Sequence, residues 1–175
     1  MKKLSRILIL GNAGTGKNYR GERLSKAIRI PFYDIDDIIF KEKFTIIRSK
    51  PQRSRLARTL AKKRRWICGA FPSAWNSSLA QSSQKIIILT ENRIILAYRI
   101  ITRYFKRKHS QAPEKESLFG LWNLLKFMWH DFRPEGKKGI YFEKIKKKYA
   151  CKIVLLHAKK EQAAYFAKLA EECKK

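Results

Sequence analysis

Three glycines and a lysine near the start of the chain have the types and spacing of a phosphate-binding loop. Gly11, Gly16 and Lys17 satisfy the pattern GxxxxGK, and Gly14 adds a glycine inside it. Glycines allow backbone conformations in which successive N–H groups surround phosphate oxygens, and the lysine neutralises phosphate charge. A glycine-rich turn without a ligand is the alternative. We expect the nucleotide loop to comprise Gly11, Asn12, Ala13, Gly14, Thr15, Gly16, Lys17 and Asn18.

The last position of such a loop usually binds the metal ion. Such loops hold Mg²⁺ through a Ser or Thr hydroxyl, whereas this chain has Asn18. An amide oxygen can also bind a hard cation, so Asn18 is a weak candidate ligand for Mg²⁺. At the end of the third predicted strand, many such proteins carry an aspartate that positions Mg²⁺, and here Cys68 stands instead. We expect ATP and Mg²⁺ as cofactors, with the efficiency of magnesium-dependent catalysis left open.

Three carboxylates, Asp34, Asp36 and Asp37, cluster in a chain with only 14 acidic residues. A carboxylate beside a phosphate loop can orient an acceptor hydroxyl or hold a water on Mg²⁺. We expect Asp36 to be catalytic, and Asp34 and Asp36 to contact the substrate. The alternative for Asp36 is capping of a helix that begins before the apolar residues Ile38 and Ile39.

Three arginines lie on one predicted helix. Arg99 and Arg103 share a face because they are four residues apart, and Arg93 precedes them by six. Guanidinium groups that close over a triphosphate stabilise the charge that spreads during transfer. We therefore include Arg93, Arg99 and Arg103 with Lys17 and Asp36 as candidate catalytic residues. A solvated basic helix is the alternative.

Alternating strands and helices must position these residues. Apolar runs predict strands at 6–10, 30–35, 66–68, 85–89 and 152–156. Helical spacing predicts helices at 17–28, 51–63, 92–106, 118–132 and 159–171, and a short helix that ends at Tyr149. This alternation indicates an α/β three-layer sandwich with a central parallel sheet of about five strands. We expect one domain over 1–175, a helical lid-like insertion at about 93–135, and a buried amphipathic helix at 118–129.

The composition is strongly basic. Lys and Arg number 41 against 14 Asp and Glu, a formal charge of +27, which favours phosphate ligands and non-specific nucleic acid as partners. A biased composition without a nucleic-acid site is the alternative. Three widely spaced cysteines indicate neither a disulfide framework nor a zinc site, so we expect a cytoplasmic protein. No apolar run is long enough to span a membrane, and contact of 118–129 with a membrane surface is a minor alternative.

The order of these motifs resembles the bacterial family of DNA topology modulation proteins, which are small phosphate-loop proteins similar to adenylate and shikimate kinases. The segments that carry the resemblance are GNAGTGK at 11–17, PFYDIDDIIF at 31–40, RWICGAFPSAW at 65–75, the arginine-bearing segment 86–107, APEK at 112–115 and LLKFMWHDF at 124–132. The resemblance implies a kinase-like fold, a nucleotide loop at Gly11, Gly14, Gly16 and Lys17, an acceptor-side acid at Asp36, and lid-region basic residues at Arg93, Arg99 and Arg103.

These observations leave three hypotheses of function. The first is a phosphotransferase that moves the γ-phosphoryl of ATP to a small acceptor such as a nucleoside, a nucleotide or another metabolite. The second is a basic, DNA-associated modulator of topology, as the family name implies. The third is a degenerate nucleotide-binding protein with little catalysis, because Asn18 and Cys68 depart from the pattern at the positions that handle the metal.

Overall fold

Five parallel strands form the central sheet of the computed structural model, which describes residues 4–42, 46–109, 117–133 and 135–174. Strands β1 (Arg6–Gly11), β5 (Trp66–Ala70) and β6 (Lys85–Leu89) are buried along almost their whole length, as expected for strands covered on both faces. The edge strands are β2 (Phe32–Asp34) and β7 (Ile153–Leu156). The order β2-β5-β1-β6-β7, with every pairing parallel, confirms the predicted sheet.

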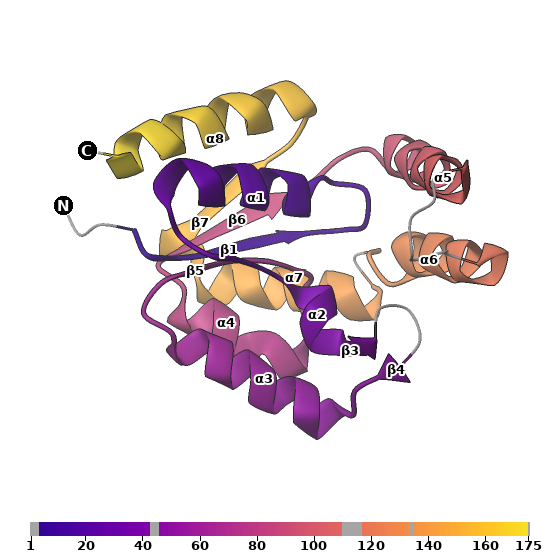
Figure 1. Ribbon diagram of the computed structural model, residues 1–175, viewed down its shortest axis with the longest axis horizontal. Coiled ribbons are helices and arrows are strands. Elements are labelled where there is room, and N and C mark those ends of the chain that lie inside the picture. The colour runs from indigo at the N-terminus through magenta and orange to yellow at the C-terminus, as the bar shows by residue number, and fades with distance from the viewer. Residues whose placement is uncertain (1–3, 43–45, 110–116, 134, 175) are drawn as a thin grey trace.

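Helices cover both faces of this sheet, so the predicted three-layer sandwich is also confirmed (Figure 1). One face packs against α1 (Lys17–Ile28) and α8 (Lys159–Lys174) through an apolar cluster that includes Leu24 and Phe166. The other face packs against α3 (Lys50–Lys62), α4 (Ser77–Ser82) and α7 (Lys137–Lys148). Burial on both faces explains why the central strands are continuous runs of apolar residues.

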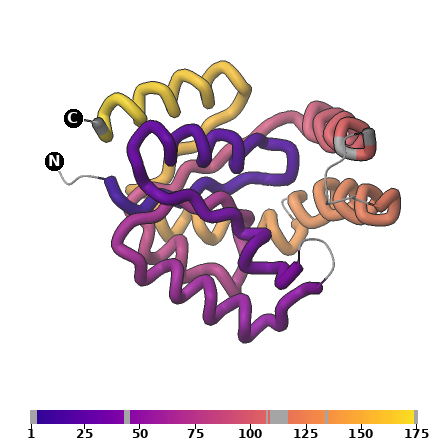
Figure 2. The backbone as a smooth tube through the Cα atoms, viewed as in Figure 1, coloured from indigo at the N-terminus to yellow at the C-terminus, as the bar shows by residue number. Residues whose placement is uncertain are grey.

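Two further helices lie beside the sandwich, at the right of the view in Figures 1 and 2. Helices α5 (Arg93–His109) and α6 (Leu118–His130) pack against each other through Leu96, Ile100 and Met128. The helix predicted at 118–129 is present, but the prediction that it is buried is wrong, since Met128 alone is buried in α6. The inner face of α6 meets α5, and no described element covers its outer face. Most of the predicted link 109–116, with APEK at 112–115, lies outside the described residues.

Several short elements were not predicted. Helix α2 (Ile35–Ile39) follows β2 directly, so the strand predicted at 30–35 ends early. An antiparallel pair, β3 (Phe40–Glu42) and β4 (Ile46–Ile47), follows α2. Single 3₁₀ turns occupy Ala74–Asn76 and Ala150–Lys152. Elements this short have too few residues to show a periodic pattern. In the described part of the chain, no helix is both long enough and apolar enough to cross a membrane.

Candidate active site

The glycine pattern occupies the connection between β1 and α1. β1 ends at Gly11 and α1 begins at Lys17, so the loop lies where a central parallel strand ends. Gly14 and Gly16 have φ angles of 80° and 83°, which glycine adopts without the strain of a side chain. A Cβ at Gly16 would meet nothing within 4 Å, so the backbone there is open. The first N–H groups of α1 have no partners within the helix and can bind anionic oxygens.

Polar side chains inside the loop fix its shape. Asn12 Oδ1 accepts a hydrogen bond from the Ala13 N–H at 2.7 Å, and Asn12 Nδ2 donates to the carbonyl of Met128 at 3.3 Å. Thr15 Oγ1 donates to the carbonyl of Asn12 at 2.8 Å. Both Asn12 and Thr15 are buried. The loop is therefore held from within and is also tied to α6.

A cavity of about 590 Å³ opens beside the loop and brings together most of the predicted site residues. Lys17 and Asn18 contribute from the start of α1, and Arg99 and Arg103 from α5. Asp34 and Asp36 contribute from the end of β2 and the first turn of α2. The cavity is lined by Gly11, Ala13, Gly14, Gly16, Lys17, Asn18, Tyr19, Glu22, Asp34, Asp36, Phe71, Arg99, Arg103, Leu124, Phe127 and Phe132.

Opposite charges meet at Lys17. Burial lowers the pKa of the Lys17 ammonium, and the carboxylates of Asp36 and Asp34 oppose that effect by favouring the charged form. Arg103 is close enough to add a further, smaller lowering of the Lys17 pKa. The cavity thus holds a lysine between an acidic pair and an arginine, a distribution suited to a ligand with both anionic and hydroxyl groups.

Asp34 is the cap of α2, which corrects the alternative considered for Asp36. Asp34 Oδ1 accepts a hydrogen bond from the backbone N–H of Asp36 at 3.1 Å, and Asp36 lies in the first helical turn. Asp34 Oδ2 accepts from Asn18 Nδ2. Burial, reinforced by the neighbouring Asp36, raises the pKa of Asp34 to about 6. Two bonded oxygens hold the Asp34 carboxyl in place at the edge of the cavity.

The side chain of Asn18 is enclosed between two strands. Its Nδ2 donates to Asp34, while its Oδ1 is buried without a hydrogen-bond partner among the described residues. A Cβ at Gly69 would lie only 2.7 Å from that oxygen, so Oδ1 rests against β5. A role for Asn18 as a ligand of Mg²⁺ stays a prediction.

The residues around the cavity fit a magnesium ion only if water and substrate phosphates provide most of the ligands of that ion. No group of three His, Cys, Asp or Glu residues that could hold a metal occurs in the described ranges. Mg²⁺ commonly binds one or two carboxylates and completes its coordination shell with water and substrate phosphates. Asp34 and Asp36 could supply the carboxylates here. Cys68 is fully buried in β5, and burial raises the pKa of its thiol, as expected for a packing residue.

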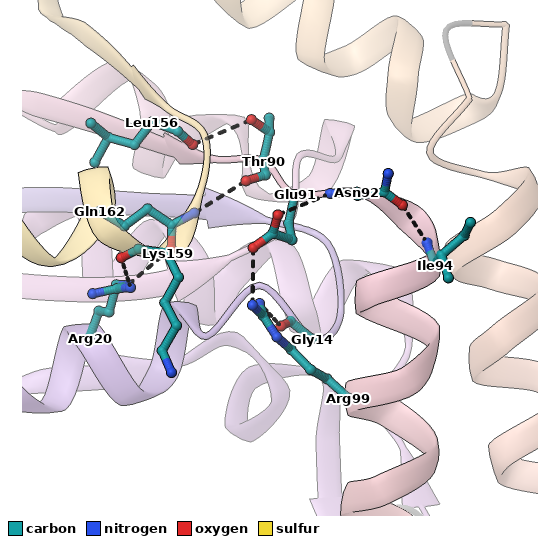
Figure 3. Close-up of polar contacts among 10 residues, drawn as sticks. All are labelled: Gly14, Arg20, Thr90, Glu91, Asn92, Ile94, Arg99, Leu156, Lys159 and Gln162. Atoms are coloured by element: carbon teal, nitrogen blue, oxygen red, sulfur yellow. Dashed lines mark hydrogen bonds and ion pairs between the residues drawn. The ribbon is translucent and has the colours of Figure 1, made fainter.

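Arg99 links α5 to the phosphate loop. Its Nη2 donates to Glu91 Oε2 at 3.0 Å, and its Nη1 donates to the carbonyl of Gly14 at 3.4 Å (Figure 3). Glu91 was not predicted as a site residue. It follows the end of β6, at the edge of the sheet where ligands of parallel sheets bind, and this position could have indicated it. Arg93 does not line the cavity of Lys17. It lines a separate cavity of about 190 Å³.

An aromatic wall forms the far side of the cavity. Phe71 follows the end of β5, and its ring meets that of Phe127 from α6 edge to face at 5.8 Å. Phe127 in turn meets Phe132 at 5.4 Å. Lys138 Nζ lies 4.6 Å from the centre of the Phe71 ring, and burial lowers the pKa of this ammonium. These aromatic residues lie in the segments 65–75 and 124–132, but no pattern within them indicated contact with a ligand.

Comparison with known proteins supports the fold and leaves the family open. No protein-family model matches the chain. The uncharacterised protein YqaC of Bacillus subtilis (strain 168) is 31% identical over 108 residues, which are 61% of this chain and 60% of YqaC. The match therefore spans less than two thirds of that relative.

Solved structures match over almost the whole chain. A shikimate kinase from Acinetobacter baumannii in complex with shikimate has a TM-score of 0.56 at 16% identity, covering 98% of this chain and 93% of that one. A shikimate kinase from Bacteroides thetaiotaomicron has a TM-score of 0.55 at 14% identity, covering 98% and 99%. A gluconokinase from Sinorhizobium meliloti 1021 has a TM-score of 0.53 at 18% identity, covering 99% and 98%. This chain has the phosphate-loop kinase fold. The expected resemblance to DNA topology modulation proteins finds no support in these matches.

Proposed function

We propose that the protein is an ATP-dependent phosphotransferase that acts on a small hydroxyl- or phosphate-bearing acceptor such as a nucleoside, a nucleotide or another metabolite. One observation carries the proposal: the open glycine loop and Lys17 share a cavity with Asp34 and Asp36 on one side and Arg99 and Arg103 on the other. The kinase fold shared with solved shikimate kinases and a gluconokinase supports it.

The proposed division of labour follows the geometry. When bound, ATP supplies the phosphoryl group and Mg²⁺ neutralises part of its charge. The loop N–H groups and Lys17 hold the phosphates at the start of α1. Arg99 and Arg103 approach from α5 and stabilise charge that spreads during transfer. Helices α5 and α6 act in this proposal as a lid.

The acceptor binds between the acidic pair and the aromatic wall. Asp36 orients the acceptor hydroxyl and takes its proton, because it lines the cavity from the first turn of α2. Asp34 holds that turn in place through its bond to the Asp36 N–H and supplies a second carboxylate oxygen to the acceptor. Phe71 and Phe127 bound the same space and exclude water from it.

A single-turnover experiment tests the proposal. Purified protein in excess over γ-labelled ATP, with Mg²⁺ or Mn²⁺, is incubated with nucleosides, nucleotides, sugars and sugar acids, and labelled products are separated. We expect transfer to one acceptor class, and a loss of at least about 100-fold in rate in Lys17→Ala. Lys26→Ala, an exposed lysine on the same helix, is the matched control and should keep the parent rate. Nucleotide binding without transfer or hydrolysis would refute the catalytic proposal and favour the degenerate alternative.

A second candidate function is non-specific binding of nucleic acid, which only the formal charge of +27 favours. Such binding depends on phosphate contacts, so its affinity falls steeply with salt and is indifferent to base sequence. Titration of duplex DNA at low salt and at about 0.15 M salt tests it. No measurable affinity at the higher salt would remove this candidate.

A further inference from the structure

The helix pair α5 and α6 carries most of the large apolar side chains that face solvent. Nine of the fifteen exposed large hydrophobic residues in the described ranges lie on these two helices: Ile94, Ile95, Tyr98, Ile101, Phe105, Leu118, Phe119, Trp122 and Trp129. Exposed apolar residues scattered singly are ordinary, whereas a concentration on one part of a molecule marks a contact surface. We call these nine residues the apolar surface of the helix pair.

The arrangement on α5 is regular. Ile94, Tyr98, Ile101 and Phe105 recur at spacings of four, three and four, which places them on one stripe of the helix. Ile94 is 71% and Tyr98 70% exposed, so this stripe is not the face that packs on α6. The spacing also places Arg103 on nearly the opposite side of α5 from Ile101. The helix therefore has one face for the cavity and another, apolar face with no described element over it.

Helix α6 repeats the pattern. Leu118, Trp122 and Trp129 share its outer face, and Phe119 beside them is 75% exposed. Its inner face, with Leu121, Leu124 and Met128, packs toward α5. Surface helices of compact proteins normally bury their apolar stripe in the core. Here both helices use one stripe for each other and present a second stripe to solvent.

The charged side chains on these two helices have one sign. Neither α5 nor α6 contains an Asp or Glu, whereas Lys106, Lys108 and Lys126 are exposed on them. Lys126 Nζ lies 5.6 Å from the centre of the Trp122 ring, so one cation sits directly at the apolar surface. The partner of such a surface must offer an apolar phase together with negative charge.

We propose that the apolar surface of the helix pair docks on the surface of an anionic lipid bilayer. Helices that lie in the membrane interface combine exposed Trp, Phe, Tyr and Leu with Lys and Arg, and their binding adds apolar burial to attraction by anionic headgroups. The helix pair has this composition on helices that lie beside the sandwich (Figure 2). This proposal is independent of the catalytic one.

Other partners fit these observations less well. Duplex DNA offers negative phosphates, but its bases are stacked inside the helix and leave no apolar phase for five exposed aromatic side chains. A second copy of the chain offers an apolar surface, but two chains of formal charge +27 repel each other, and no acidic residue on either helix compensates. An anionic bilayer supplies both requirements at once.

Vesicle binding by the full chain tests the proposal. Flotation is measured with phosphatidylcholine vesicles containing about 30 mol% phosphatidylglycerol and with pure phosphatidylcholine, at about 0.15 M salt. The double variant Phe119→Ser/Trp122→Ser and the control Ile47→Ser/Ile140→Ser each remove two exposed apolar side chains without changing the net charge. We expect the partition coefficient on anionic vesicles to fall at least about tenfold in the first variant and to change less than about twofold in the control.

A second measurement separates insertion from adsorption by charge. Lipids brominated in their acyl chains should quench tryptophan fluorescence of the parent. This quenching should fall in the variant Trp122→Phe, which removes one exposed tryptophan and keeps an aromatic ring at that position. Equal binding by the parent and Phe119→Ser/Trp122→Ser, without quenching, would mean adsorption by charge alone and would overturn the proposal. Self-association of the parent in sedimentation that this double variant abolishes, or a selective loss of duplex DNA binding in it, would also overturn the proposal in favour of those partners.

Discussion

Replacing Asp34 by Asn tests whether the negative charge of this partly buried carboxylate destabilises the folded protein. The pKa of Asp34 is raised from 3.8 to about 6, mainly because the carboxyl is desolvated and then because Asp36 is close. The native protein therefore binds more protons than the unfolded chain between about pH 4 and pH 6. The contribution of Asp34 to stability is fully present below about pH 4 and is lost as the pH rises through about 6.

The magnitude follows from the size of that shift. Each pKa unit is worth about 1.4 kcal/mol, so a shift of about two units amounts to roughly 3 kcal/mol in the unfolding free energy. The residue is only half-buried, so screening by solvent reduces this to about 2 kcal/mol. Asparagine keeps an oxygen that can cap α2 and carries no charge. We expect Asp34→Asn to be more stable than the parent by about 2 kcal/mol at pH 7.5, which raises Tm by about 4–8 °C.

Urea unfolding of the parent and the variant from pH 4 to pH 8 measures this difference. The gain should become small near pH 4, because the native carboxyl is then protonated and the unfolded one, with a pKa of 3.8, is about half protonated. Asp37→Asn removes an exposed carboxylate from the same turn and should change stability by less than about 0.5 kcal/mol at every pH, which controls for the change in net charge. A destabilised Asp34→Asn variant, or a difference from the parent that does not depend on pH, would refute the reasoning.

Three further predictions concern the surroundings of the loop. Glu91→Gln should tighten binding of a fluorescent ATP analogue by about 3- to 10-fold, because Arg99 loses a competing carboxylate at 3.0 Å; unchanged affinity would contradict this. Gly69→Ala should destabilise the protein by about 1–3 kcal/mol in urea unfolding, because the added Cβ meets Asn18 Oδ1 at 2.7 Å and the Phe32 ring at 3.0 Å. Adding Asn18→Ser should recover part of that loss, and no recovery would mean that Phe32 alone is the obstacle. Asn18→Ser by itself should raise the single-turnover rate with Mg²⁺, since a hydroxyl then stands at the position that usually meets the metal.

The sheet and the loop could be predicted because local sequence determines them. The runs at Arg6–Gly11 and Lys85–Leu89 are apolar throughout and end in a glycine or a polar cluster, so strand and strand end are both visible. The position of the loop then follows from the position of β1. Lys17, Asp34 and Asp36 meet because parallel strands end at one edge of the sheet.

The features that were not predicted depend on tertiary contacts, which a local sequence pattern does not reveal. Segment 118–129 has the spacing of an amphipathic helix, and the sequence does not reveal that only one of its faces has a partner. Glu91 pairs with Arg99 eight residues later, and this pair depends on how α5 leaves β6. Capping of α2 was considered only as an alternative for Asp36, and the cap is Asp34, because the five-residue helix gives no periodic signal that would mark its first turn.

Asn18, Asp34 and Gly69 form one unit, and this explains how the departure at the last loop position is accommodated. A half-buried carboxylate needs donors, and the longer side chain of Asn18 reaches Asp34 with its amide N–H, which a serine hydroxyl at this position would be too short to do. The amide oxygen is then directed against β5, where a glycine leaves room for it. Asn18→Ser should therefore gain rate at a cost to Asp34, whose pKa rises above its present value of about 6 when this donor is lost. Asp34 contacts the acceptor in the proposed mechanism, so we expect activity to rise with pH as this carboxyl ionises near pH 6. In Asn18→Ser this rise should shift to higher pH, and a gain in rate with an unchanged pH profile would show that Asn18 and Asp34 are not coupled.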